Sequence, residues 1–264
     1  MDGSLRIGII GGAGWLGSAI AGSLLDVGVI EPEHLSLSYR REQPARFPSS
    51  FWTADNQALA DRSDLIVLSV RPADWPALTV VAHDKLIISV MAGIRLEQLA
   101  AHHETTRVVR ALPNAAAEVA RSYTPWIASR QVSEEDRKLV RAIFDACGTQ
   151  DEVGSEADID YMTGLTGSGP AFPALLAAAM MHDATARGLQ KDFAQRAVNA
   201  MLIGTGRLLE RRQSCPDAIV EAFLDYRGTT AAAIESMRAA GFDAAVGEGL
   251  KAAFEKSVSM GETS

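Results

Sequence analysis

The sequence predicts an α/β protein in two parts: an N-terminal, Rossmann-type doubly wound sheet over residues 1–152 and an all-helical C-terminal domain over residues 153–264. In the first part, short and nearly continuous Val/Ile/Leu runs alternate with helical or loop segments, which is typical of buried parallel strands. Beyond Glu156 no convincing strand follows, and Ala, Leu and Met recur at helical spacing.

The first elements are a strand over residues 7–10 and a helix over residues 16–25, joined by a glycine-rich turn. Gly12, Gly14 and Gly17 fit the pattern G-x-G-x-x-G, with Trp15 and Leu16 inside it. A glycine turn lets a ligand approach the main chain, and the start of the helix attracts a phosphate. The turn is therefore a candidate dinucleotide site. The alternative is a tight turn that is merely rich in glycine.

The second strand, over residues 34–38, is followed by basic residues. An NAD site usually carries an acid here, which accepts hydrogen bonds from the ribose 2′-hydroxyl. This chain has Ser38, Arg40 and Arg41 instead. Arginine pairs with a 2′-phosphate, so we expect NADP as the cofactor, with NADPH preferred and NADH acceptable. The alternative is that both arginines only solvate a loop.

Four further strands are expected over residues 64–70, 85–90, 106–112 and 124–129, and a helix over residues 133–148. Ligands of such sheets bind beyond the carboxyl ends of the strands. The strand ends supply these candidate cofactor contacts: Val70, Arg71, Pro72, Ala92, Gly93 and Asn114. For Asn114 the alternative is a capping role after Pro113.

Five helices are expected in the C-terminal part, over residues 170–187, 191–212, 216–225, 229–239 and 243–260. The first two have long apolar faces, which predict a homodimer or higher homo-oligomer. A monomer with those faces packed on the sheet domain is the alternative.

Two turns at helix starts are candidate substrate sites. "TGSGPA" offers Thr166, Ser168 and the amides around Gly169 to an anion. "YRGTT" offers Thr229 and Thr230 at the start of another helix. Helix capping alone also explains both turns.

Composition excludes several classes of function. The net charge of −8 and the pI near 5.2 argue against nucleic-acid binding. No apolar stretch is long enough to span a membrane and no signal-peptide pattern is present, so we expect a cytoplasmic protein. The five histidines lack metal-ligand spacing, and no metal site is expected. Cys147 and Cys215 are expected to be inert core thiols.

Several segments together carry a resemblance to a known family. They are "IGIIGGAGWLGSAI", "SYRR", "VRP" (70–72), "SVMAGI" (89–94), "RALPNAAA" (110–117), "GLTGSGPAF" (164–172) and "RGTTAAAIESMRAAGF" (227–242). In this order, over almost the whole length, they resemble the pyrroline-5-carboxylate reductase family, which makes proline by reducing a cyclic imine with NAD(P)H. The resemblance implies an oxidoreductase acting on a CH–NH group and a helical dimerisation domain.

The resemblance also implies roles for residues in the last of these segments. Thr229 and Gly228 would lie at the substrate carboxylate, and Thr230 would reach the imine nitrogen and donate a proton. Arg227 stands where the family has a glycine; it either neutralises Asp225 or binds the substrate itself. In the "TGSGPA" turn, the position at a helix start makes Ser168 a further catalytic candidate, with Thr166 and Gly169 as candidate substrate contacts.

Three departures from the family pattern concern mainly the substrate end. Asp225 replaces a serine, Ala178 replaces a glutamate, and Trp15 and Leu16 replace smaller or polar residues and methionine. The expected reaction is reduction of 1-pyrroline-5-carboxylate to L-proline. A divergent imine reductase with another substrate, even one without a carboxylate, and a non-catalytic NADPH sensor remain alternatives.

Overall fold

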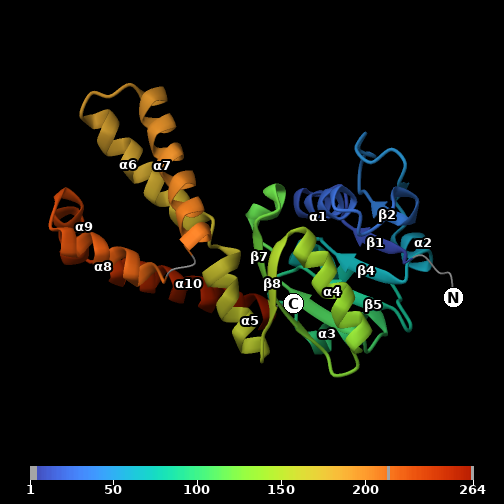
Figure 1. The fold of residues 1–264 in the computed structure, drawn as a ribbon. Helices are drawn as coiled ribbons and strands as arrows, with labels where there is room; N and C mark the ends of the chain where they lie inside the picture. The colour runs from blue at the N-terminus through green and yellow to red at the C-terminus, as the bar shows by residue number, and fades with distance from the viewer. Residues whose placement is uncertain (1–4, 213–214, 263–264) are drawn as a thin grey trace. The chain divides into compact units, whose positions relative to one another are not determined.

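The computed structural model describes residues 5–212 and 215–262, which form two compact units (Figure 1). The first unit comprises the described residues up to Ser168 and those from Ala252 onward. The second unit comprises Gly169–Lys251. The domain boundary expected at residues 152/153 remains a prediction.

The first unit is built on an eight-stranded sheet in the order β3-β2-β1-β4-β5-β6-β7-β8. Neighbouring strands are parallel except β6 and β7, which are antiparallel. The strands are β1 (Ile7–Ile10), β2 (Leu35–Ser38), β3 (Phe51–Thr53), β4 (Leu65–Leu68), β5 (Leu86–Ser89), β6 (Val108–Ala111), β7 (Ser122–Ala128) and β8 (Gly148–Glu152).

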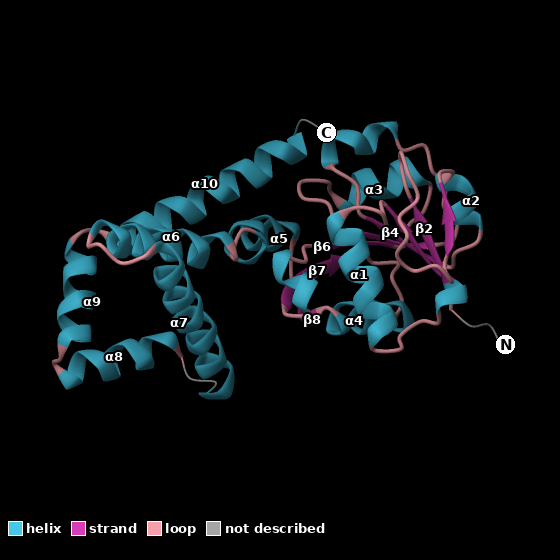
Figure 2. Cartoon of the chain, turned by 90° about the horizontal axis from the view of Figure 1, so that it is seen from above, coloured by secondary structure: helices cyan, strands magenta, loops and turns pink. Residues whose placement is uncertain are grey.

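Both faces of this sheet are buried, which explains the continuous apolar runs. Successive strand residues point to opposite faces, so Ile9 joins one core cluster and Ile10 joins the other. The first cluster contains residues of α1 (Trp15–Asp26) and α4 (Glu134–Ala146). Figure 2 shows these two helices on the same side of the strands.

The opposite face is covered by α2 (Asn56–Asp61), the 3₁₀ helix η2 (Pro72–Ala77) and α3 (Leu96–His103). Shorter elements complete the first unit: η1 (Pro32–His34), η3 (Ala115–Val119), α5 (Glu156–Met162) and the π-helix η4 (Thr163–Gly167). The last part of α10 (Phe242–Glu262) also belongs to it.

The described part of the second unit is helical, with α6 (Ala171–Ala186), α7 (Lys191–Arg212), α8 (Pro216–Tyr226), α9 (Thr229–Ala239) and the first part of α10. Large apolar side chains on α6 and α7 are exposed: Leu175 is 73% exposed, Phe193 53% and Ile203 59%. Among the helices of the described ranges, none combines the length and apolar character of a membrane span.

The predicted fold class is confirmed: a doubly wound sheet comes first and helices follow. β3, α2, α3 and β8 were not anticipated. Cys147 lies in the core, and burial raises the pKa of its thiol to about 11. The expectation for Cys215 was wrong, because this residue is exposed just before α8.

Candidate functional site

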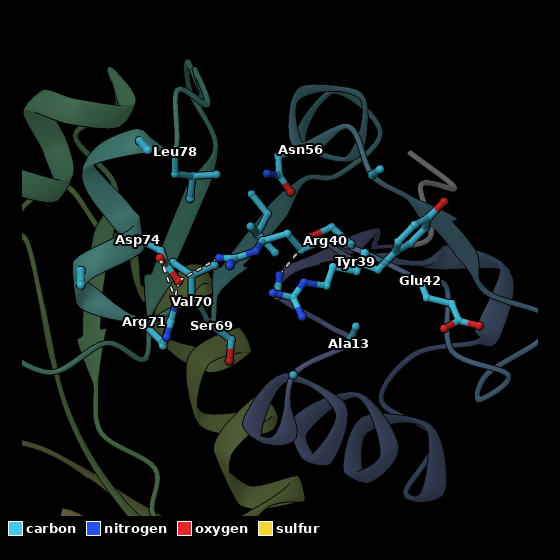
Figure 3. A pocket seen from close by; sticks show the side chains of 18 residues that line it. Ala13, Tyr39, Arg40, Glu42, Asn56, Ser69, Val70, Arg71, Asp74 and Leu78 are labelled. Atoms are coloured by element: carbon cyan, nitrogen blue, oxygen red, sulfur yellow. Dashed lines mark hydrogen bonds and ion pairs between the residues drawn. The ribbon is translucent and has the colours of Figure 1, made fainter.

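A cavity of about 860 Å³ opens where the carboxyl ends of β1, β2 and β4 meet (Figure 3). One wall is the glycine turn between β1 and α1, another is the segment after β2, and a third is η2 with the residues that precede it. This is the place where doubly wound sheets bind ligands, and the volume suits a small-molecule cofactor.

The glycine turn is packed so tightly that side chains are excluded from it. Gly11 has a φ of +84°, and a Cβ on it would lie 2.3 Å from the Ser69 carbonyl oxygen. A Cβ on Gly17 would lie 2.4 Å from the Gly11 carbonyl oxygen. The turn therefore presents bare backbone to the cavity at the start of α1, where the first amides of a helix have no intrahelical partner.

Ser38, the last residue of β2, holds this turn in place. Its hydroxyl oxygen accepts a hydrogen bond from the Gly11 N–H at 3.0 Å, and its carbonyl accepts one from the Ala13 N–H at 3.1 Å. Ser38 is buried and still lines the cavity. Its hydroxyl thus fixes the glycine turn against β2.

Charged side chains gather on the walls formed by the segment after β2 and by η2. The Asp74 carboxylate on η2 accepts hydrogen bonds from Arg71 Nε at 2.8 Å and Arg71 Nη2 at 3.1 Å. Arg40, which follows β2, reaches the same carboxylate with Nη1 at 3.2 Å, as Figure 3 shows. Hydrogen bonding to Arg71 holds the pKa of Asp74 below its usual value.

A buried aromatic cluster anchors η2 to α3. The Trp75 indole N–H donates to His103 Nε2 at 2.9 Å, so the proton of a neutral His103 sits on Nδ1, which donates to the Val80 carbonyl at 2.8 Å. The ring of His102 lies 4.5 Å from that of Trp75. Desolvation lowers the pKa of His103. A neutral histidine thereby supports the segment that carries Asp74.

Most of the predicted cofactor residues lie together at this cavity. Gly14, Ser38, Arg40, Arg41, Val70 and Arg71 line it. Gly12 and Gly17 shape the turn, Leu16 lies in the first turn of α1, and Pro72 begins η2. The exposed Trp15 begins α1, and its indole N–H donates to the Glu118 carboxylate of η3.

Ala92 and Gly93 are not among the residues that line the cavity. Gly93 has a φ of +82° and is buried against the end of α10, where a Cβ on it would lie 2.9 Å from the Cβ of Met260. The positive φ and the missing side chain of Gly93 therefore allow the end of α10 to pack closely against it. A cofactor contact by Ala92 and Gly93 remains a prediction.

Asn114 connects β6 to the π-helix. Its side-chain oxygen accepts from the Ala116 N–H at 2.9 Å and thus caps η3, while its Nδ2 donates to the Thr166 carbonyl at 3.0 Å. The Thr166 hydroxyl donates to the Met162 carbonyl at 3.0 Å, and the Ser168 hydroxyl to that of Thr163 at 3.3 Å. The π-helix therefore ends at Gly167, and the hydroxyls of Thr166 and Ser168 are bonded to the preceding turn.

A buried ion network lies behind Asn114. Arg110 of β6, only 1% exposed, donates to Glu156 Oε1 at 2.6 Å and to Asp160 Oδ1 at 3.0 Å. Glu156 Oε1 also accepts from the Leu96 N–H at 3.0 Å. Arg110 thus fixes α5, which leads directly into η4.

The remaining predicted substrate residues lie in the second unit. Arg227 ends α8 with a φ of +53°, in the left-handed region, and Gly228 caps α9. Thr229 and Thr230 are the first residues of α9, and both are exposed. Gly169 precedes α6 in the same unit. Asp225 is exposed in the last turn of α8.

Several residues that line the cavity were not among the predicted contacts, such as Gly11, Tyr39, Asn56 and Asp74. Of these four, only Asp74 had a recognisable sequence signal: it is an acid three residues after Arg71, close to the end of a predicted strand. Over residues 5–212 and 215–262, no group of His, Cys, Asp and Glu side chains has the arrangement of a metal site.

Two family models match the chain. Residues 156–260 match the model described as pyrroline-5-carboxylate reductase dimerisation. Residues 6–93 match the model described as NADP oxidoreductase, coenzyme F420-dependent. The second range covers the glycine turn, the arginines after β2 and η2.

Similar proteins extend the match over nearly the whole chain. Pyrroline-5-carboxylate reductase of Synechocystis is 30% identical over 98% of this chain and 99% of its own. The enzyme of that name from Thermus thermophilus is 31% identical over 98% and 100%. The structure of 1-pyrroline-5-carboxylate reductase from Streptococcus pyogenes is 28% identical, covers 97% and 99% of the two chains and has a TM-score of 0.85.

Proposed function

The chain belongs to the pyrroline-5-carboxylate reductase family, and we propose that it reduces 1-pyrroline-5-carboxylate to L-proline with NADPH. The observation that carries this proposal is the cavity between the glycine turn and the arginines of the first unit. Family membership and the cavity agree, since residues 6–93, which contain the whole cavity lining, also match an NADP oxidoreductase model.

The cavity fits a dinucleotide at both ends. At one end, Gly11 and Gly17 leave no room for side chains, so a pyrophosphate can approach the backbone at the start of α1. At the other end, Arg40, Arg41 and Arg71 line the wall. Arginine forms bidentate hydrogen bonds with phosphate, which supports NADPH as the preferred cofactor, with NADH as an acceptable second.

When bound, NADPH supplies a hydride to the imine carbon of the substrate. The chain's own residues have to orient the imine and keep a proton on its nitrogen. We assign these tasks to the start of α9, where Gly228 and Thr229 offer backbone amides to the substrate carboxylate and Thr230 offers its hydroxyl to the nitrogen. Thr166, Ser168 and Gly169 are proposed as further substrate contacts, and Asn114 as a contact of the nicotinamide side.

Two charged residues flank that helix start. Arg227 is positive and adjoins the cap of α9, so it favours a carboxylated substrate. Asp225, two residues earlier, is negative and would repel the substrate carboxylate. We infer that Arg227 outweighs Asp225, because Arg227 is next to the capping residue Gly228.

The second unit is proposed to form a homodimer. It contains most of the region that matches the family's dimerisation domain. None of the side chains of α6 is buried within the chain, and apolar residues such as Leu175 are exposed. Contiguous exposed apolar faces mark association surfaces.

The test is the initial rate of NADPH and NADH oxidation by the purified protein, with 1-pyrroline-5-carboxylate and unsubstituted 1-pyrroline measured in parallel. We expect the highest kcat/KM for NADPH with the carboxylated imine. Faster turnover of 1-pyrroline would replace the proposal by a divergent imine reductase. Cofactor binding without turnover of either imine would replace it by a sensor.

Variants at residue 230 test the proposed proton donor. Thr230→Ala should lower kcat with the carboxylated imine by about a hundredfold, while Thr230→Ser should restore most of it. The control is Thr149→Ala, which removes an exposed threonine hydroxyl from β8 of the first unit and should leave kcat unchanged. Equal rates for Thr230→Ala and the control would remove Thr230 from the mechanism.

A further inference from the structure

The charged end of the cavity contains an acid as well as arginines, and the acid is engaged with them. Asp74 lies on η2 and Arg40 follows β2, so their ion pair at 3.2 Å connects two walls of the cavity. Arg71 binds the same carboxylate through two hydrogen bonds, at 2.8 and 3.1 Å. One carboxylate thus holds both arginines.

The two ion pairs differ in strength. The Arg71–Asp74 pair is bidentate and local in sequence, whereas Arg40 makes one contact at the longest of the three distances. The Arg40 side chain is also 69% exposed, and single exposed pairs contribute little free energy. A ligand phosphate therefore displaces Asp74 from Arg40 more readily than from Arg71.

We propose that Asp74 is a specificity-determining residue that lowers the preference of this site for NADPH over NADH, by competing with the 2′-phosphate for Arg40. This inference rests on the proposed function, in which Arg40 receives that phosphate. After displacement the carboxylate stays close to the phosphate through Arg71 and repels it. The ribose of NADH carries a hydroxyl instead, which can donate a hydrogen bond to a carboxylate.

The charge state of Asp74 is consistent with this role. The hydrogen bonds from Arg71 lower the pKa of the carboxyl, so it is ionised at neutral pH. Glu42 provides a matched comparison, because it is a second acid that lines the same cavity. Among the described residues no ion pair joins Glu42 to Arg40. The proposal therefore predicts an effect at Asp74 and none at Glu42.

The experiment measures the dissociation constants of NADP⁺, NAD⁺, 2′,5′-ADP and 5′-AMP by calorimetry. Asp74→Asn should raise the affinity ratio of NADP⁺ to NAD⁺, and that of 2′,5′-ADP to 5′-AMP, by about three- to tenfold. Glu42→Gln should leave both ratios within about twofold of the unmodified chain. An equal rise in both variants would show a general charge effect and overturn the proposal.

A double-mutant cycle shows whether Asp74 acts through Arg40. In an Arg40→Gln background, Asp74→Asn should raise both ratios less than it does in the unmodified chain, because the competition for Arg40 is gone and only the repulsion by the carboxylate remains. A full effect in that background would overturn the proposal. Unchanged affinity ratios in the Asp74→Asn single variant would also overturn the proposal, provided that its thermal unfolding shows it to be folded like the unmodified chain.

Failure of the proposed function gives a different result. If the unmodified chain binds neither NADP⁺ nor 2′,5′-ADP, the assignment of the cavity falls, and the inference falls with it. If the chain binds both and the ratio is the same in Asp74→Asn, only the role of Asp74 is overturned.

Discussion

At the scale of single residues, the glycine turn shows both the strength and the limit of sequence reasoning. The pattern G-x-G-x-x-G identified Gly12, Gly14 and Gly17. It passed over Gly11, whose missing Cβ makes room for the Ser69 carbonyl. Ser69 follows β4, a neighbouring strand that is distant in sequence. Gly11 belongs to the glycine-rich turn of the sequence, but its need for glycine comes from a neighbouring strand, and such a requirement has no local sequence signal.

His103 leads to a prediction about pH. Its folded-state pKa lies below the usual 6.5, since the neutral ring is buried between Trp75 and the Val80 carbonyl. The unfolded chain therefore binds a proton more readily than the folded chain. The stabilisation is complete above pH 6.5 and is lost as the pH falls from there through the folded-state pKa. Urea unfolding should show a loss of at most about 1.4 kcal/mol per pH unit from this group.

The matched variant is His103→Gln, whose amide oxygen can still accept a hydrogen bond from Trp75 but does not titrate. It should be less stable at pH 8, and the decline of its unfolding free energy between about pH 7 and pH 5.5 should be shallower. A decline as steep as that of the unmodified chain would assign the pH dependence to other groups.

At the scale of elements, the strands were easier to predict than the segments that complete the site. Buried parallel strands leave continuous apolar runs, and all six expected strands agree with the structure to within two residues at each end. η2 has no such pattern. It contains two prolines and depends on Trp75 packing against α3, a contact between elements far apart in the sequence. The position of Asp74 could not be predicted for the same reason.

The Arg110 network predicts that removing this buried arginine lowers the free energy of unfolding more than removing an exposed one. Arg110→Leu leaves Asp160 buried without its main partner, because Arg95 reaches it only at 3.8 Å. The unfolding free energy in urea should fall by about 3–5 kcal/mol. The control is Arg141→Leu, which breaks a more exposed pair with Glu134 on α4 and should cost less than about 1 kcal/mol. Equal losses would contradict a structural role for the network.

At the scale of the whole molecule, the sequence predicted two different halves because their apolar patterns differ. Short continuous apolar runs mark the sheet, and helical spacing marks the part after Glu156. The limits of the compact units were not evident, since the end of α10 packs on Gly93 of the first unit. The boundary between the units falls inside α10, where the amino-acid composition does not change.

The reaction proposed for this chain is hydride transfer from NADPH to the imine carbon of 1-pyrroline-5-carboxylate. The most direct test uses NADPH that carries deuterium in the transferable position at C4 of the nicotinamide, with the product analysed by mass spectrometry and NMR. The account predicts L-proline with one deuterium at C5, formed in equal amount to the NADPH consumed. NADPH consumption without labelled proline, or binding of NADPH without any consumption, would contradict it.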